Sequence, residues 1–265
     1  MRFEFYSLRL EFTAREPLYF PPGKAANTLR GALGTVLDAS IFAPRASGEG
    51  PSGLADPPRP FVFRARHLDG YEIQPGEAFH FDLNVFFREP KIFIDAFAAL
   101  AEQGIGPRRR KAHLERVACA EPVSIDLSPG PADIRNIRVE FLTPAELKHA
   151  GEIASEPEFP ILFARIRDRV STLRSLYGAG ALEIDFREIG DRAAAIRMVR
   201  SEMQRVETRR RSSRTGQTHG IGGFTGFAEY EGDLDEFLPW LEAARWTGVG
   251  RQAVWGKGEI RLQRL

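Results

Sequence analysis

Cysteine is almost missing from this chain of 265 residues, since Cys119 is its single thiol. One cysteine excludes an intramolecular disulfide framework and a zinc site built from several thiolates, and it favours a reducing, cytoplasmic compartment. Long apolar runs are missing too, and charges at Arg2, Glu4 and Arg9 interrupt the first segment. We therefore expect neither a membrane span nor a secretory signal.

An excess of one charge is also missing. The chain has 37 Lys and Arg against 36 Asp and Glu, a net charge of +1, which alone does not indicate a nucleic-acid partner. The basic residues are mostly arginines, and they form two clusters: Arg108, Arg109, Arg110, Lys111 and Arg116, and then Arg205, Arg209, Arg210, Arg211 and Arg214. Arginine suits bidentate contact with phosphate, but for either cluster alone a solvated surface is the simpler explanation.

The usual cofactor motifs do not occur. None of the five histidines stands in His-x3-His or His-Glu-x-x-His spacing. Lys257 is followed by Gly258 rather than by Ser or Thr, which excludes a P-loop. Neither a Gly-x-Ser-x-Gly turn nor a dinucleotide fingerprint is present. We expect no metal ion and no organic cofactor.

What the chain does contain is one order of strands and helices that occurs twice. The first half predicts a strand at 3–12 with a bulge near Tyr6 and Ser7, a helix at 24–38, strands at 61–63 and 79–85, a helix from Pro90, and a strand or strand pair within 111–127. After a linker at 129–131, the second half predicts a strand from 137, a helix at 160–177, strands at 204–211 and 220–230, a helix from 234 capped by Asp233, and a strand at 260–262.

The order β-α-β-β-α-β is that of the ferredoxin-like, split-βαβ arrangement. We therefore predict an α+β protein of two tandem ferredoxin-like (RRM-like) domains, residues 1–130 and residues 131–265, each with an antiparallel sheet. Both helices of such a domain cover one face of the sheet, so the other face is left for a partner.

A glycine-rich loop is predicted between the last helix and the last strand. It contains two glycine pairs, Gly248 and Gly250 and then Gly256 and Gly258, with cations at Arg251 and Lys257 and large aromatic rings at Trp246 and Trp255. Paired glycines let backbone amides approach an anion closely, and tryptophans stack on bases. A structural hairpin with its aromatics in the core is the alternative, but the cations and tryptophans favour a site for a polyphosphate backbone.

Three stretches resemble the precursor-crRNA-processing endoribonucleases of the RAMP superfamily of CRISPR-associated proteins. They are residues 29–34 (LRGALG), residues 97–117 with the turn Gly104-Ile105-Gly106, and the segment from Arg211 through Gly222 and Leu238-Pro239 to the glycine-rich loop. The resemblance implies a protein that binds CRISPR repeat RNA and cuts it without metal. It also implies attack by the ribose 2′-OH, which leaves a 2′,3′-cyclic phosphate and a 5′-OH.

The chain departs from this family in its histidines. Many relatives have a catalytic histidine in or near the first helix, whereas this chain has none before His67, and Gly248 stands where the subfamily often has another. The resemblance therefore leaves the catalytic residues to be assigned from the neighbouring polar groups. His219 lies between the second basic cluster and a glycine-rich strand. The unperturbed pKa of a histidine, near 6.5, suits acid/base work, although an exposed loop histidine is the simpler explanation.

We accordingly assign His219 as acid or base and Lys24 as its electrostatic or proton-transfer partner. The residues assigned to RNA binding are Arg209, Arg210, Arg211, Arg214, Gly248, Gly250, Arg251, Gly256, Lys257 and Gly258. Two other functions stay open. One is a non-catalytic RAMP subunit that binds guide RNA in an interference complex, and the other is a ferredoxin-like ligand- or protein-binding module without RNA activity. The expected partners are repeat RNA and, as further candidates, other CRISPR-associated proteins.

Overall fold

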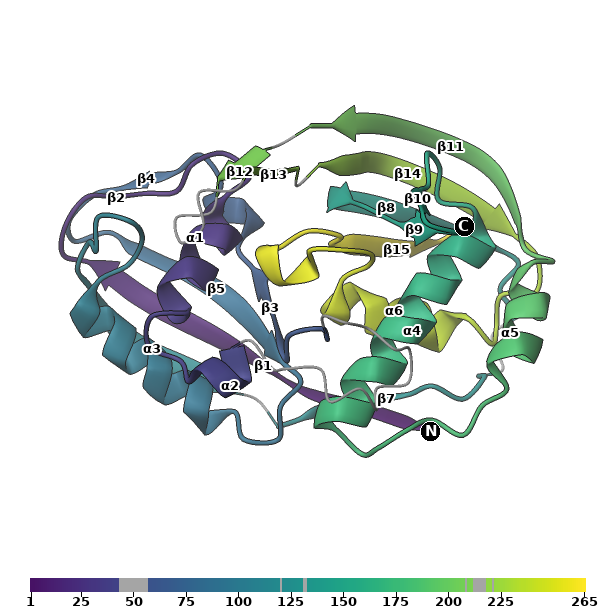
Figure 1. Cartoon of the computed structure of the whole chain (residues 1–265), viewed down its shortest axis with the longest axis horizontal. Helices are drawn as coiled ribbons and strands as arrows, with labels where there is room; N and C mark the ends of the chain where they lie inside the picture. The colour runs from purple at the N-terminus through teal and green to yellow at the C-terminus, as the bar shows by residue number, and fades with distance from the viewer. Residues whose placement is uncertain (43–56, 120, 131–132, 208, 212–217, 221) are drawn as a thin grey trace.

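The computed structural model describes residues 1–42, 57–119, 121–130, 133–207, 209–211, 218–220 and 222–265. Its two large sheets are antiparallel, one in each half of the chain (Figure 1). Within the described residues no helix has the length and apolar character needed to cross a membrane.

Both sheets have the same strand order. The first consists of β1 (Arg2–Ala14), β3 (Phe61–Arg64), β5 (Ala78–Val85) and β6 (Ala112–Cys119) in the order β3-β5-β1-β6, and β7 (Val123–Asp126) also pairs with β1. The second consists of β8 (Asn136–Ala145), β11 (Arg197–Val206), β14 (Gly223–Glu231) and β15 (Ile260–Arg264) in the order β11-β14-β8-β15. Numbered along the chain, each sheet reads second, third, first, fourth. This is the order of a split βαβ unit, so the predicted fold class is confirmed.

Helices cover one face of each sheet. The first sheet carries α1 (Ala25–Leu33) and α3 (Lys91–Gln103), the second carries α4 (Phe159–Tyr177) and α6 (Leu238–Thr247), and two short helices, α2 (Ala39–Phe42) and α5 (Phe186–Ala193), lie at the periphery. Small elements complete the fold: the pairs β2 (Leu18–Tyr19) with β4 (Glu72–Ile73), β9 (Lys148–His149) with β10 (Glu152–Ile153) and β12 (Arg209–Arg211) with β13 (Thr218–Gly220), and the 3-10 turns η1 (Arg66–Leu68) and η2 (Ala253–Trp255). The predicted division at residue 130 falls between β7 and β8 and stays a prediction.

Strand β1 contributes to both hydrophobic cores. Phe3 and Phe5 are buried among residues of the second half, whereas Leu8 and Leu10 are buried under the helices of the first half. Pairing with β5 continues without a shift from Tyr6 onwards. The apolar pattern changes phase because the strand buries opposite faces at its two ends. On the other edge of β1 the register is shifted between Glu11 and Phe12, and the bulge near Tyr6 and Ser7 stays a prediction.

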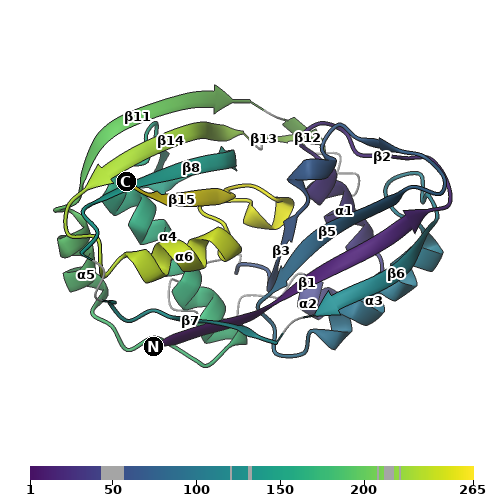
Figure 2. The same ribbon diagram turned by 180° about the vertical axis from the view of Figure 1, so that it is seen from behind.

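Two helix boundaries differ from the sequence-based expectation. α6 begins at Leu238 with Phe237 before it, so Asp233 is not its N-cap. α1 ends at Leu33 rather than near residue 38. In the view from behind, the first sheet and the open face of its strands lie in front of α1 and α3 (Figure 2). Each sheet thus has one face covered by its own helices, and part of the open face of the first sheet meets the second half.

Candidate functional site

The glycine-rich loop of the second half packs against the first helix of the first half. A Cβ added at Gly256 would lie 2.6 Å from the Cβ of Ala26. The Nζ of Lys257 donates a hydrogen bond to the carbonyl oxygen of Gly23, 3.4 Å away. The guanidinium of Arg30 lies 5.5 Å from the centroid of the Trp255 ring. These contacts bring the beginning of α1 and the loop into one junction between the two halves.

Asp69 lies at this junction and caps the first turn of α1. Its Oδ1 accepts a hydrogen bond of 2.8 Å from the backbone N–H of Ala25, which satisfies one of the free donors of the helix start. Lys257 is buried, with 5% of its surface exposed. Burial raises the pKa of Asp69, and burial lowers the pKa of Lys257. Each charge partly offsets the shift of the other, so the two form an electrostatically linked pair.

A cavity of about 110 Å³ opens at the junction, and its lining includes Gly23, Arg66, Asp69, Thr143, Trp255 and Lys257. The lining therefore combines two cations, one carboxylate and a tryptophan ring from both halves of the chain. Cations held in a partly desolvated site act more strongly on a phosphate than cations in free solution.

The backbone conformation of the loop explains why glycine occupies the second position of each pair. Gly250 and Gly258 have φ of 73° and 65°, which disfavours any residue with a Cβ. A Cβ at Gly258 would lie 1.9 Å from the carbonyl oxygen of Val249, and one at Gly250 would lie 2.4 Å from that of Glu146. These positions are thus required for close approach of backbone to backbone, and contact of the glycines with RNA stays a prediction.

The loop begins at a helix end that both halves hold in place. Arg64 of β3 donates from Nη2 to the carbonyls of Arg245 (2.7 Å) and Trp246 (3.1 Å), and Asn84 of β5 donates to Trp246 at 2.9 Å. From α4, Arg169 donates to the carbonyl of Thr247 at 2.8 Å. Positive charge at a helix C-terminus is favourable. The last carbonyls of α6, directly before Gly248, are therefore bound by one buried side chain, that of Asn84, and by two half-buried ones, those of Arg64 and Arg169.

The guanidiniums of Arg64 and Arg169 are held in a partly desolvated position at this helix end. Burial lowers the pKa of Arg64, and burial together with the charge of Arg64 lowers the pKa of Arg169 to about 10. Ordinary surface positions would not shift a guanidinium in this way. Partly desolvated guanidiniums therefore hold the end of α6, and with it the start of the glycine-rich loop, through hydrogen bonds.

The structure brings together some of the predicted site residues. Lys24 directly precedes α1, and its charge contributes to lowering the pKa of Lys257, so these two predicted cations lie near each other. Arg251 instead forms an ion pair of 2.7 Å with Glu146. Gly248 ends α6, and Gly256 lies against α1. Their RNA contacts stay predictions.

Three arginines of the second basic cluster form strand β12, which pairs with β13, whereas Arg205 lies on β11. The backbone register of this β12–β13 hairpin pairs Arg209 with Gly220, Arg210 with His219, and Arg211 with Thr218, whereas Arg214 lies outside the described residues. Figures 1 and 2 draw this hairpin towards the end of the molecule where α1 begins. The backbone thus places predicted catalytic and RNA-binding positions opposite each other on two paired strands.

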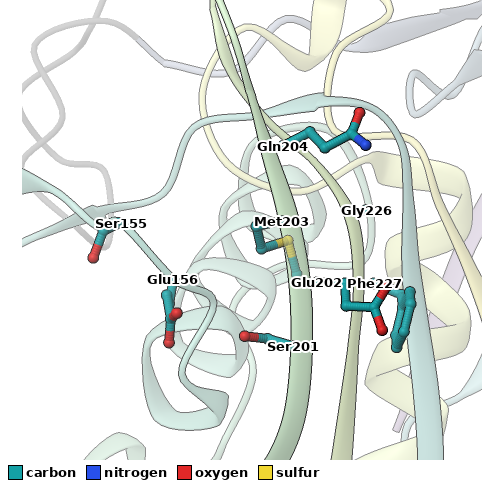
Figure 3. Close-up of a pocket in the computed structure, with 8 residues that line it drawn as sticks. All are labelled: Ser155, Glu156, Ser201, Glu202, Met203, Gln204, Gly226 and Phe227. Atoms are coloured by element: carbon teal, nitrogen blue, oxygen red, sulfur yellow. The ribbon is translucent and has the colours of Figure 1, made fainter.

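A larger hollow, of about 790 Å³, lies away from this junction. It is lined by Ser155, Glu156, Ser201, Glu202, Met203, Gln204, Gly226 and Phe227 (Figure 3). The ionisable side chains that line it are carboxylates, and the guanidinium of Arg200 pairs with Glu202. This lining does not favour a phosphate chain, so the junction is the better candidate site.

Sequence reasoning missed Asp69, Arg64 and Arg169. No local motif marks them, because each acts on a partner that is distant along the chain: Asp69 on Ala25, Arg64 on Arg245, and Arg169 on Thr247. The sequence contained only a weak indication of these three residues. An arginine at the end of an apolar strand, as in Phe61–Arg64, is equally expected from a solvated strand end.

Comparison with known families gives one match in each half of the chain. Residues 139–260 match the family model of the CRISPR-associated endoribonuclease Cas6, and residues 39–131 match a second model, described as an N-terminal domain. No curated protein sequence matches the chain.

Several solved structures share the fold over the whole chain. A Cas6 product complex aligns with a TM-score of 0.65 over 98% of this chain and 99% of that chain, at 17% identity. Cas6 of Thermus thermophilus aligns with a TM-score of 0.60 over 99% of both chains, at 16% identity. A partial Cas6–RT–Cas1–Cas2 complex aligns with a TM-score of 0.63 over 99% of this chain and 46% of that chain, at 10% identity. The second half of the chain thus matches the family model of the CRISPR-associated endoribonuclease Cas6, and along its whole length the chain shares the fold of solved Cas6 structures.

Proposed function

We propose that the protein cuts precursor CRISPR RNA within its repeats without a metal ion. The ribose 2′-OH attacks the adjacent phosphorus, the bond to the 5′-oxygen breaks, and the products carry a 2′,3′-cyclic phosphate and a 5′-OH. The match of residues 139–260 to the Cas6 family carries this proposal. The reaction needs a base for the 2′-OH, a cation for the developing phosphorane charge and an acid for the leaving oxygen.

The junction between α1 and the loop supports the proposal electrostatically. Lys24 and Lys257 come from different halves of the chain and lie close enough to influence each other. A buried ammonium with few competing partners is suited to stabilise charge that develops on a phosphate. Lys24 is then the electrostatic or proton-transfer partner of the reaction, and Lys257 adds to the positive field behind it.

His219 is the acid or base of the proposed mechanism. Its strand pairs with the arginine-rich strand β12 in a register that sets it opposite Arg210. Arg209, Arg210, Arg211 and Arg214, with Arg251, are the proposed contacts to the RNA backbone, because guanidinium groups bind phosphate oxygens bidentately.

The proposed partner is CRISPR repeat RNA. Two of the similar structures are described as Cas6 complexes with product and with a substrate mimic. Other CRISPR-associated proteins are a second class of proposed partner, since a further similar structure is a complex that includes Cas1 and Cas2.

One experiment tests the reaction. The protein is incubated with repeat RNA in excess EDTA, and the ends of the product are identified. We expect one discrete cut whose upstream fragment ends in a 2′,3′-cyclic phosphate, and no cut when the nucleotide before the scissile phosphate is 2′-deoxy. RNA that is bound but never cut supports the guide-binding subunit instead. An RNA affinity that is weak and independent of salt supports the module without RNA activity.

A substitution tests the assigned residue. His219→Ala is expected to lower the single-turnover rate by about 100-fold or more while repeat RNA stays bound, because removal of an acid or base affects the transition state. An unchanged rate would remove His219 from the mechanism without touching the proposed reaction.

A further inference from the structure

Two histidines that are distant in sequence are stacked on the open face of the first sheet. His67 in η1 and His80 on β5 have ring centroids 4.6 Å apart and ring planes inclined by 25°. His67 Nε2 lies 2.8 Å from the carbonyl oxygen of His80. Since a carbonyl oxygen only accepts hydrogen bonds, Nε2 is the donor and carries the hydrogen.

This hydrogen bond fixes the tautomer of His67. In the neutral ring, a hydrogen on Nε2 leaves the lone pair on Nδ1. Among the described residues, none forms a hydrogen bond with that Nδ1, and the side chain of His67 is exposed. The exposed ring of His67 thus keeps a proton-accepting nitrogen, and its orientation is held by the backbone of β5.

The surroundings of His80 disfavour the charged form of its ring. Burial, His67 and Arg9 lower the pKa of His80, against opposing effects of Asp82 and Glu11. Arg9 is bound to Asp82 at 2.8 Å, and Glu11 is bound to Arg116 at 2.7 Å. The carboxylates next to His80 are thus already paired with arginines.

The pair lies beside the junction described above. Arg66, directly before His67, lines the cavity that also contains Lys257, and Asp69, two residues after His67, caps α1. On β5, Asn84 contacts the end of α6 four residues beyond His80, which corresponds to about 13 Å along a strand. The stacked histidines therefore stand on the exposed part of the sheet face where the two halves meet.

We propose that His67 is the general base that accepts the proton of the attacking ribose 2′-OH, and that His80 is the positioning residue that orients it. This inference rests on the proposed function and separates its two proton transfers. The 2′-oxygen forms its bond to phosphorus as its proton moves to Nδ1 of His67. The 5′-oxygen leaves with the electron pair of the broken bond and takes a proton from His219.

Variants of single histidines test the proposal, with His113 as the matched control. His113 is exposed on strand β6, which pairs with the other edge of β1, and its Nδ1 lies 3.3 Å from Arg15 Nη2. We expect His67→Ala to lower the single-turnover cleavage rate by about 100-fold or more, with the dissociation constant of repeat RNA changed less than about 2-fold. His113→Ala should cleave like the wild type. His80→Ala keeps the carbonyl that accepts the hydrogen bond, so its loss should be smaller than that of His67→Ala.

Two further measurements separate a base from a structural residue. Added imidazole should restore cleavage by His67→Ala, and the acidic limb of the pH–rate profile should disappear in this variant. His67→Asn keeps a donor for the His80 carbonyl and should remain slow although its melting temperature is that of the wild type.

The outcomes distinguish this assignment from the function on which it rests. Cleavage by His67→Ala at the wild-type rate, or a parallel loss of binding and cleavage, would overturn the assignment of His67 alone. Wild-type protein that gives no cyclic phosphate end would overturn the proposed reaction and this assignment with it.

Discussion

The Nζ of Lys257 donates a hydrogen bond to the carbonyl oxygen of Gly23 across the junction of the two halves. The bond ties the glycine-rich loop to the residue that precedes Lys24 and α1. A cation of the second half is thereby held against the helix start of the first half, and its charge is available only where both halves are correctly packed.

Asp69→Asn and Asp69→Ala separate capping from charge. Asparagine keeps an oxygen for the N–H of Ala25, whereas alanine does not, so we expect Asp69→Ala to be less stable than Asp69→Asn by about 1 kcal/mol. Denaturation with urea at neutral pH measures the difference. Equal stability of the two variants would show that the cap of Ala25 contributes nothing.

The same residue predicts a pH dependence of stability. Because burial raises the pKa of Asp69 above 3.8, the folded state binds the proton more tightly than the unfolded state. The contribution of Asp69 is therefore most favourable below pH 3.8 and is lost as the pH rises through the folded-state pKa. Compared with Asp69→Asn, the wild type should lose stability over this interval, as followed by urea denaturation at successive pH values. A constant difference between the two proteins would contradict the raised pKa.

The opposite sign is expected for Lys257. Burial lowers its pKa below 10.5, so the unfolded state binds the proton more tightly between the lowered pKa and 10.5. Stability should then rise with pH across this window. Lys257→Met removes the titrating group, and its unfolding free energy should lack the rise. Parallel pH profiles of the two proteins would show that Lys257 is solvated.

Glycine substitutions test the geometry of the loop. Gly258→Ala places a Cβ 1.9 Å from the carbonyl of Val249 at a φ of 65°, and we expect a loss of about 2–4 kcal/mol. Gly31→Ala is the control, because it stands within α1 with no heavy atom within 4 Å of the added Cβ. Alanine there should stabilise the protein by up to about 1 kcal/mol. Thermal melts of both variants provide the comparison, and a stable Gly258→Ala would refute the close approach.

Removal of the hairpin arginines should weaken RNA binding through electrostatics. Replacement of Arg209, Arg210 and Arg211 by alanine should lower the slope of log affinity against log salt by about 2 to 3 units, since each phosphate contact contributes about 0.7 to 0.9. The control removes three arginines that are ion-paired on the second sheet, Arg197, Arg200 and Arg261. Equal slopes for the two triple variants would contradict a backbone contact by the hairpin.

The repeated element order was predictable because each half alternates apolar residues with a clear period. The helix Phe159–Tyr177 and the strand Ala78–Val85 agree closely with the sequence-based expectation. The short helix α5 was missed because only Ile189 and Ala193 of its eight residues are buried. Its start is stabilised by Asp185, whose side chain accepts from the N–H groups of Arg187 and Glu188, a signal that is too common in loops to identify a helix.

The candidate site was predictable only in part. The loop glycines and Lys24 stood out by composition and by resemblance, yet their meeting at one junction depends on how the halves pack. Asp69 and the stacked pair of His67 and His80 had no local pattern, because their partners lie 44 and 13 residues away. Such contacts depend on tertiary structure, which local sequence periodicity does not predict.

Phe3 and Phe5 begin the chain but are buried in the second half, on the strand that continues into the first half. A fragment that starts after β1 would therefore have a cavity in the core of the second half, where the two phenyl rings pack. The first half on its own would expose those rings to water. The core of the second half thus depends on residues at the start of the first half. A second half transferred to another protein would need Phe3 and Phe5, or equivalent side chains, to complete its core.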